Sequence, residues 1–168
     1  GVHSNGYSLV RKIIEITGAD LAAPEPGGGG RSLAEALLTP TRLYQRAVNC
    51  ALVTGGVHGI VHVTGGGLIE NPPRIYSDDV SLILDLAAKP LPSIFAWLKA
   101  AGNINDYELA RTFNCGIGML LFVAPGSADT VMANLTEGPE PNAWVAGKLI
   151  GRSSQPSVIL QNIESWAC

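Results

Sequence analysis

The chain has few cysteines, no cluster of basic residues and no long apolar run. Its three cysteines, Cys50, Cys115 and Cys168, are far apart and odd in number, which favours free thiols in a reducing compartment. A net charge of −3 without a basic patch argues against a nucleic-acid partner. No run approaches the roughly 20 apolar residues of a membrane span, and no charged-then-apolar leader opens the chain. We therefore expect no membrane association, no signal peptide and a cytoplasmic location.

The sequence nevertheless holds enough apolar material for one domain with a sizeable core, because 46% of its 168 residues are hydrophobic. Apolar and β-branched runs predict strands over 57–63, 82–86, 117–123, 143–150 and 158–160. The 117–123 run is apolar throughout, which suits a strand buried on both faces. The strand–helix–strand order at the C-terminal end suggests a crossover unit. The pattern as a whole predicts mixed helix and sheet.

Helices are predicted around these strands. A first helix has its apolar residues at helical spacing, a candidate N-cap at Ser4 or Asn5, and an end at Gly18. Thr39 and Pro40 predict a second strong helix start, with threonine as N-cap and proline at the first helical position. Its expected buried face comprises Leu43, Ala47, Val48, Ala51 and Leu52. Further helices are expected over 32–38, after the glycines at 65–67, over 92–102, and from caps at Asn105 and Ser127.

A glycine-rich turn is the most informative local feature. A β-branched run ends at Thr64-Gly65-Gly66-Gly67, and a helix-like run follows. Glycines let the backbone approach a ligand closely, and a helix start points free N–H groups and a positive dipole end at the same spot. These features predict an anion site, usually for phosphate. A tight strand-to-helix turn with nothing bound explains the pattern equally well.

A second polar segment opens the chain at His3, Ser4, Asn5 and Gly6, directly before the first helix. Three polar side chains converge there on one helix N-terminus, so ligand binding and plain capping are both open. The other glycine tract, at 27–30, is not followed by Gly-Lys-Ser or Gly-Lys-Thr. We therefore reject a phosphate loop there.

The remaining histidines and cationic residues are weaker candidates. His58 and His62 are four apart and share one face of a strand, which leaves open a metal pair, a structural role or a role facing substrate. No third metal ligand is evident, so no metal site is assigned. Arg42 and Arg74 are the nearest cationic candidates for a ribose phosphate, although surface or salt-bridge roles explain them as well.

Asn114 and Cys115 stand at the mouth of the apolar run 117–123. Asn114 is a candidate for the same anion site, and its alternative role is to hydrogen-bond the backbone turn at Gly116. No histidine or aspartate placement supports Cys115 as a nucleophile, so it is interpreted as a small buried residue.

Five blocks of the sequence resemble those of one enzyme family, in the family's order and over nearly the whole chain. They lie at 1–11, beginning Gly1-Val2-His3-Ser4-Asn5-Gly6, at 37–44, at 62–74 with the glycine turn, at 111–119, with Arg111-Thr112-Phe113-Asn114-Cys115-Gly116, and at 142–147. On these blocks the chain resembles the C-terminal half of the aminoimidazole ribonucleotide synthetase family, also called phosphoribosylformylglycinamidine cyclo-ligases.

The resemblance implies that residues 1–168 are the C-terminal domain of a two-domain enzyme of purine synthesis, with the N-terminal domain absent from this chain. It implies an α+β fold with a mixed sheet flanked by helices, partly ferredoxin-like. The implied reaction uses ATP and Mg²⁺, bound mainly by the N-terminal domain, to close the imidazole ring of formylglycinamidine ribonucleotide. Implied partners are that nucleotide, the N-terminal domain and, in the full-length enzyme, a second copy in a homodimer. The isolated chain is expected to be inactive.

We expect two segments and one further residue to bind the substrate or its phosphate. These residues are His3, Ser4, Asn5, Gly6, Thr64, Gly65, Gly66, Gly67 and Asn114. The catalytic residues are left unassigned. Two alternatives stay open. One is the substrate-side domain of another superfamily member, of the formylglycinamidine ribonucleotide synthetase or selenophosphate synthetase type. The other is a module that keeps the fold and serves only in assembly.

Overall fold

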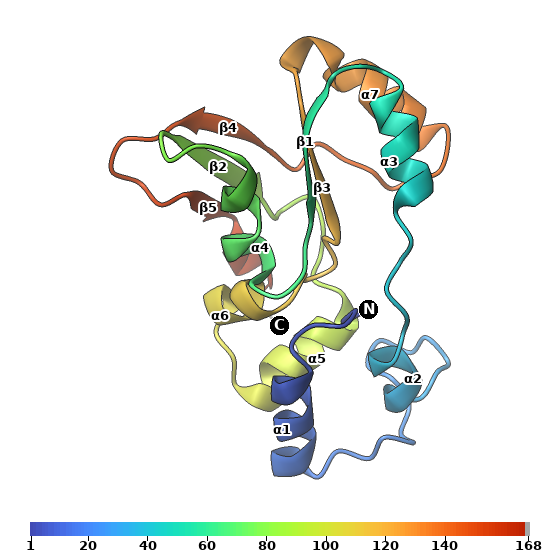
Figure 1. Ribbon diagram of the computed structural model, residues 1–168. Coiled ribbons are helices and arrows are strands. Elements are labelled where there is room, and N and C mark those ends of the chain that lie inside the picture. Colours follow the sequence, from blue (N-terminus) through green and yellow to red (C-terminus); the bar gives the residue numbers. More distant parts are fainter. Residues whose placement is uncertain (167–168) are drawn as a thin grey trace.

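The computed structural model describes residues 1–166 and confirms the α+β class (Figure 1). Cys168 lies outside the described residues. Within 1–166, no helix combines the length and apolar character needed to cross a bilayer. The helices are α1 (Tyr7–Thr17), α2 (Leu33–Leu37), α3 (Gln45–Leu52), α4 (Gly67–Glu70), α5 (Ser93–Gly102), α6 (Asp106–Thr112) and α7 (Ala128–Thr136). The strands are β1 (Val57–His62), β2 (Val80–Asp85), β3 (Met119–Val123), β4 (Gly147–Gly151) and β5 (Val158–Gln161), with short 3₁₀ helices η1 (Pro72–Ile75), η2 (Pro125–Ser127) and η3 (Ile163–Trp166).

The strands form two small sheets. β1 pairs with β3 in an antiparallel ladder, and β2 lies between β4, which is antiparallel to it, and β5, which is parallel to it. The expected mixed sheet is thus the three-stranded one. Because β3 and β4 belong to different sheets, the crossover unit predicted at the C-terminal end is wrong. The helix between them, α7, packs on α3 at one end of the β1–β3 ladder (Figure 1).

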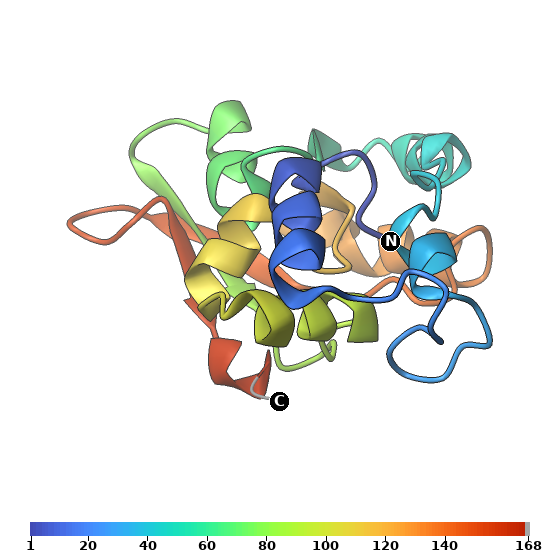
Figure 2. The same ribbon diagram turned by 90° about the horizontal axis from the view of Figure 1, so that it is seen from below.

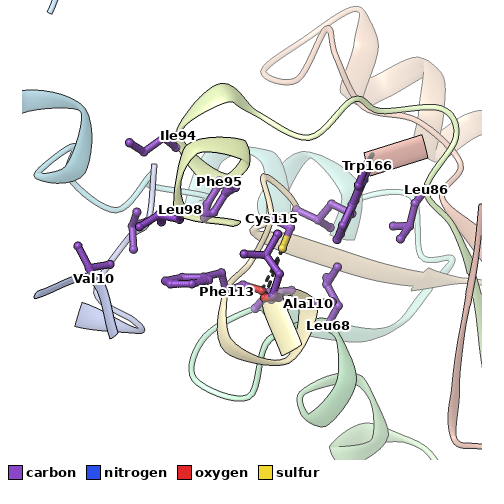
Figure 3. Packing of buried hydrophobic residues seen from close by; sticks show 14 of the residues in the cluster. Val10, Leu68, Leu86, Ile94, Phe95, Leu98, Ala110, Phe113, Cys115 and Trp166 are labelled. Carbon is purple, nitrogen blue, oxygen red and sulfur yellow. Dashed lines mark hydrogen bonds between the residues drawn. The ribbon is translucent and has the colours of Figure 1, made fainter. Parts of the chain in front are cut away.

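The main core gathers around Phe95 of α5 and Phe113 after α6, which are both fully buried with ring centroids 5.9 Å apart. α1 contributes Val10 and Ile13 from the face that it packs on α5, as Figure 2 shows from below. Cys115 lies among these residues with its thiol donating to the carbonyl oxygen of Leu109 (Figure 3). Cys115 is buried, which raises the pKa of its thiol, so the interpretation of a small buried residue is confirmed.

A second, smaller apolar cluster lies between α3 and α7. β3 serves both clusters, because Leu120 and Phe122 contact the main core while Leu121 and Val123 contact the smaller one. Both faces of β3 therefore contact apolar residues. The prediction of a strand buried on both faces is nevertheless wrong, because within β3 only Leu120 is buried and, among the described residues, β3 pairs only with β1.

Several helix ends follow the sequence signals. Gly18 ends α1 with a left-handed backbone, and Ser32 begins α2 with a reciprocal capping box to Glu35. Asn105 caps α6 through the N–H of Glu108. The prediction that Ser4 or Asn5 caps α1 is wrong, because the N-cap of α1 is Gly6, which has φ of 76°. A left-handed residue at this position leaves both polar side chains free of the helix end.

The helix start predicted at Thr39-Pro40 is also wrong. The Thr39 hydroxyl donates back to the carbonyl oxygens at the end of α2 and accepts from Arg31, so this threonine closes one helix instead of opening the next. Residues 39–44 run without helix to α3, which begins at Gln45. Of the expected buried face, Ala47 and Ala51 are buried, whereas Leu43 is 90% exposed and Leu52 is 46% exposed.

The tightest backbone approach in the site region joins α4 to α6. Gly67 has φ of 56°, and a Cβ at this position would overlap the carbonyl oxygen of Ala110. Gly18 has a similar φ of 62° but open space around it. Gly18 therefore needs glycine only for its left-handed backbone, whereas Gly67 needs it for both the backbone and the close packing.

We predict that Gly67→Ala destabilises the fold more than Gly18→Ala does. The Gly18 variant suffers only the left-handed strain, about 1 kcal/mol, whereas Gly67→Ala adds an overlap worth about 2 kcal/mol more. Urea unfolding of the two variants beside the unaltered chain measures the difference. Equal losses in the free energy of unfolding would show that α4 and α6 separate without cost.

Candidate functional site

The two polar segments singled out in the sequence lie beside each other. A Cβ placed on Gly65 would be 3.5 Å from Asn5 Oδ1, so the loop at 3–6 faces the turn at 64–67. Both segments pack on Phe113, because a Cβ on Gly6 would overlap its ring and one on Gly67 would lie 2.8 Å from its carbonyl oxygen. Segments far apart in the sequence therefore share one wall of the molecule.

Asn71 shapes the glycine turn. This side chain is 3% exposed; its Oδ1 accepts from the N–H of Thr64 and its Nδ2 donates 2.8 Å to the carbonyl oxygen of Gly65. Gly66 takes φ of 98°, and the N–H of Gly67 closes the turn onto Thr64. Sequence reasoning gave Asn71 no role, although it stands in the block at 62–74.

The anion-binding potential of this turn comes from its backbone and not from a helix dipole. α4 has only four residues, so the dipole contribution expected from the sequence is small. Among the described residues, however, the N–H groups of Gly65 and Gly66 have no hydrogen-bond partner. Two neighbouring free N–H groups on a glycine backbone are donors that an oxyanion could accept from.

His3 lies in the same region and is unusual in two ways. Its backbone has φ of 60°, and its side chain is 8% exposed with Nδ1 buried and unpartnered among residues 1–166. Burial, together with the nearby positive groups at the Gly1 amine and His62, lowers the pKa of His3 below 6.5. The imidazole is therefore neutral at pH 7. A buried polar atom without a protein partner points to a partner supplied by a ligand or water.

The remaining side chains of the loop at 3–6 are also available. Ser4 is exposed and Asn5 is half-buried, and neither makes a side-chain hydrogen bond within the described part of the chain. Asn114 behaves differently: its Oδ1 accepts from Gly116 N–H at 2.8 Å and its Nδ2 donates to the carbonyl oxygen of Gly1 at 3.2 Å. Its alternative role, holding the turn at Gly116, is thus confirmed.

A cavity of about 270 Å³ opens beside this group of residues. Of the nine predicted site residues, His3 and Asn114 line it, while the glycine turn lies outside its lining. Arg42 also lines it and pairs with Glu140 at 2.8 Å. The full lining is Gly1, His3, Thr39, Pro40, Arg42, Tyr44, Asn114, Gly116 and Gly118.

Three rings lie together, of which His3 and Tyr44 line the larger cavity. His3, Tyr44 and His62 are in mutual contact, with ring centroids 5.6 to 6.2 Å apart. His62 therefore joins His3, while His58 lies at a bulge in β1. Across residues 1–166, no group of three histidine, cysteine or acidic side chains could hold a metal ion. Sequence reasoning did not assign Tyr44 to the site, although the block at 37–44 contains it.

The two arginines weighed as phosphate partners are placed in different cavities. Arg42 lines the larger one, whereas Arg74 lines a smaller cavity of about 160 Å³ with His62 and Asn71. Of these two arginines, Arg42 is therefore the one that lines the same cavity as His3.

The geometry defines a class of protein. An α+β domain in which His3, Asn114 and an arginine line one cavity, with a glycine-rich turn facing the adjoining loop at 3–6, is a small-molecule-binding domain suited to anionic ligands. Whether each of the nine residues contacts a ligand stays a prediction.

Comparison with known proteins identifies the family. The chain belongs to the family described as AIR synthase related protein, C-terminal domain, whose model matches residues 1–158. It is 47% identical over 147 residues to the phosphoribosylformylglycinamidine cyclo-ligases of Burkholderia cenocepacia (strain HI2424) and Burkholderia orbicola (strain AU 1054). Each match covers 88% of this chain and 41% of the relative, so the chain spans about two fifths of the length of these relatives. The family resemblance expected from the sequence is confirmed.

Burial of His3 predicts a specific dependence of stability on pH. The unfolded chain takes up a proton on His3 near pH 6.5, whereas the folded chain resists it because its pKa is lowered. The unfolded state then binds more protons, so the free energy of unfolding falls as the pH drops from 7.5 through 6.5 towards the folded pKa. We expect His3→Asn, which tolerates the left-handed backbone, to lose part of this dependence.

Urea unfolding at pH 7.5, 6.5 and 5.5 measures the effect. The carboxylates whose pKa is lowered by hydrogen bonds, at Glu25, Glu35 and Asp85, titrate below this window and do not interfere. His58→Asn, on the exposed face of β1, is the matched control and is expected to keep the original slope. Identical slopes for the chain and His3→Asn would contradict the prediction.

Proposed function

We propose that this chain is the C-terminal domain of an ATP-dependent cyclo-ligase of purine biosynthesis. The whole enzyme closes the imidazole ring of formylglycinamidine ribonucleotide and yields aminoimidazole ribonucleotide, ADP and phosphate. Membership of the AIR synthase related family and the similarity to two cyclo-ligases support the reaction class. The chain alone is proposed to be inactive, with ATP and Mg²⁺ held mainly by an N-terminal domain.

One observation carries the assignment of the substrate site to this domain. Among the described residues, each of the two facing segments has polar groups without partners: the buried Nδ1 of His3 in the loop at 3–6, and the less buried N–H groups of Gly65 and Gly66 in the glycine turn. A folded domain normally satisfies its buried polar groups internally. We infer that the nucleotide supplies the missing partners, with its phosphate or formyl amide oxygens accepting from these donors.

The chemistry assigned to these residues is binding and orientation. In the proposed reaction, ATP phosphorylates the formyl amide oxygen, the amidine nitrogen attacks the activated carbon, and phosphate leaves as the ring closes. Catalysis of phosphoryl transfer consists mostly of positioning and charge stabilisation. Asn5 and the glycine turn hold polar groups of the nucleotide, the neutral His3 borders the reacting region, and Arg42 supplies positive charge at the cavity.

The proposal extends to the assembly of the whole protein. We propose a cytoplasmic enzyme in which this domain faces its own N-terminal domain, and a homodimer of the full-length protein. In this proposal the neighbouring domain would cover exposed hydrophobic side chains, among them Leu43 and Val53, which are 90% and 80% exposed in this chain.

Mixing this chain with a separately expressed N-terminal domain tests the function directly. With ATP, Mg²⁺ and formylglycinamidine ribonucleotide, we expect aminoimidazole ribonucleotide to form in the mixture and with neither half alone. If the halves associate and no product forms, the cyclo-ligase assignment is wrong. Turnover of another substrate of the superfamily would indicate that the chain belongs to a different superfamily enzyme. Turnover of no substrate would indicate a module that serves only in assembly.

The site assignment is tested in the same mixture. His3→Asn combined with Asn5→Ala removes two proposed contacts without altering Gly6, and we expect KM for the nucleotide to rise about 10- to 100-fold. His58→Asn with Asn49→Ala, which alters exposed residues on β1 and α3, is the matched control. Unchanged KM and kcat in the His3 and Asn5 variant would place the substrate elsewhere.

A further inference from the structure

Tyr44 contacts His3 although nothing in the sequence near either residue links them. The ring centroids of His3 and Tyr44 are 6.2 Å apart at 59°, and those of Tyr44 and His62 are 5.6 Å apart in an edge-to-face arrangement. His3 and His62 complete the triangle at 6.2 Å. Because the rings come from the segment before α1, the segment before α3 and the end of β1, only the tertiary fold assembles them.

The Tyr44 ring packs against Gly118, a residue without a side chain. A Cβ on Gly118 would overlap the Tyr44 hydroxyl and would lie 3.0 Å from Cε1 of His3. The carbonyl oxygen of Gly118 accepts from the N–H of Val63 at 2.9 Å, which ties this glycine to the segment after β1. Gly118 therefore leaves room for both rings, in the manner of a close approach that requires glycine.

The segment that carries Tyr44 is held at both ends. Thr39 is bonded to Arg31 and to the end of α2, and Arg42 pairs with Glu140. The carbonyl oxygen of Tyr44 then accepts from Val48 in the first turn of α3. Residues 39–44 thus form a fixed bridge between two helices, which delivers the Tyr44 ring to the cavity wall.

Apart from its ring contacts with Tyr44 and His62, the His3 side chain makes no hydrogen bond to the described residues. Its Nδ1 is unpartnered, and within residues 1–166 no hydrogen bond holds the imidazole. Aromatic pairs in edge-to-face or tilted arrangements restrict ring orientation. The Tyr44 hydroxyl likewise makes no hydrogen bond to the described residues, so the contact depends on the ring and not on the hydroxyl.

We propose that Tyr44 is a positioning residue whose ring, seated over Gly118, holds the His3 imidazole at the cavity in the orientation that binds the nucleotide substrate. The proposal rests on the function proposed above for the identity of the ligand. The placement of His3 by Tyr44 is a property of this chain and is measurable without substrate.

The first test measures the His3 imidazole by NMR in the chain of residues 1–168. The titratable and charged groups around it are His62 from β1, Tyr44 and Arg42 from the bridge, and the amino group of Gly1. Tyr44→Leu is expected to let the imidazole reach water, so that its pKa rises towards 6.5. Tyr44→Phe, which keeps the ring, is expected to keep the lowered pKa.

Tyr107→Leu is the matched control, because Tyr107 is a half-exposed tyrosine on α6 outside the cavity lining. It is expected to leave the His3 titration unchanged. If Tyr44→Leu proves unstable, Gly118→Ala provides a second route, since its methyl group would overlap the Tyr44 hydroxyl and also lie 3.0 Å from Cε1 of His3, which disturbs the contact between the two rings from the other side. An unchanged His3 pKa in both Tyr44→Leu and Gly118→Ala would overturn the proposal.

The second test is a double-mutant cycle in the mixed two-domain enzyme. We expect Tyr44→Leu to lower kcat/KM about 10- to 100-fold, mainly through KM, and Tyr44→Phe to change it little. Tyr44→Leu added to His3→Asn should cause no further loss, because a positioning residue acts only through the group that it holds. Fully additive losses, or a Tyr44→Phe loss equal to that of Tyr44→Leu, would overturn the proposal.

The two tests separate the two proposals. If His3→Asn alone leaves kcat/KM unchanged, the proposed function of His3 is wrong, and the NMR titration still decides whether Tyr44 holds the imidazole. If the titration fails while His3→Asn abolishes binding, the function stands and the positioning role of Tyr44 is wrong.

Discussion

Close packing around Phe113 is the constraint on which the site depends. Its ring leaves no space for a Cβ at Gly6, and its carbonyl oxygen leaves none at Gly67. The ring also meets Phe95 at the centre of the main core. Because one fully buried residue is in contact with both polar segments, the apolar core sets the distance between them.

Asparagines divide into two groups in this domain. Asn71 and Asn114 are almost fully buried and use their amides on backbone groups, which fixes the glycine turn and the turn at Gly116. Asn5 is half-buried and keeps its amide free beside Gly65. The same side-chain chemistry therefore builds the framework where it is buried and satisfied, and offers a ligand contact where it is not.

A similar division holds for charge. The chain carries a net charge of −3, yet the cavity near His3 is bordered by Arg42 and by neutral donors. Glu140, on the loop after α7, pairs with Arg42 and keeps its guanidinium at the cavity. In the cavity lining, local arrangement and not overall composition decides which ligand charge is favoured.

Local signals in the sequence determined much of this protein. Gly18, Ser32 and Asn105 ended or began their helices as expected, since capping depends on a few neighbouring residues, and the family blocks identified the family. The helix start predicted at Thr39-Pro40 was wrong because the Thr39 hydroxyl accepts a hydrogen bond from Arg31 and donates one to the end of α2. No local sequence pattern indicates these hydrogen bonds. Only the tertiary structure brought His3, Tyr44 and His62 together and left Nδ1 of His3 without a partner among residues 1–166. Such contacts arise from packing between distant segments, which neither spacing nor periodicity encodes.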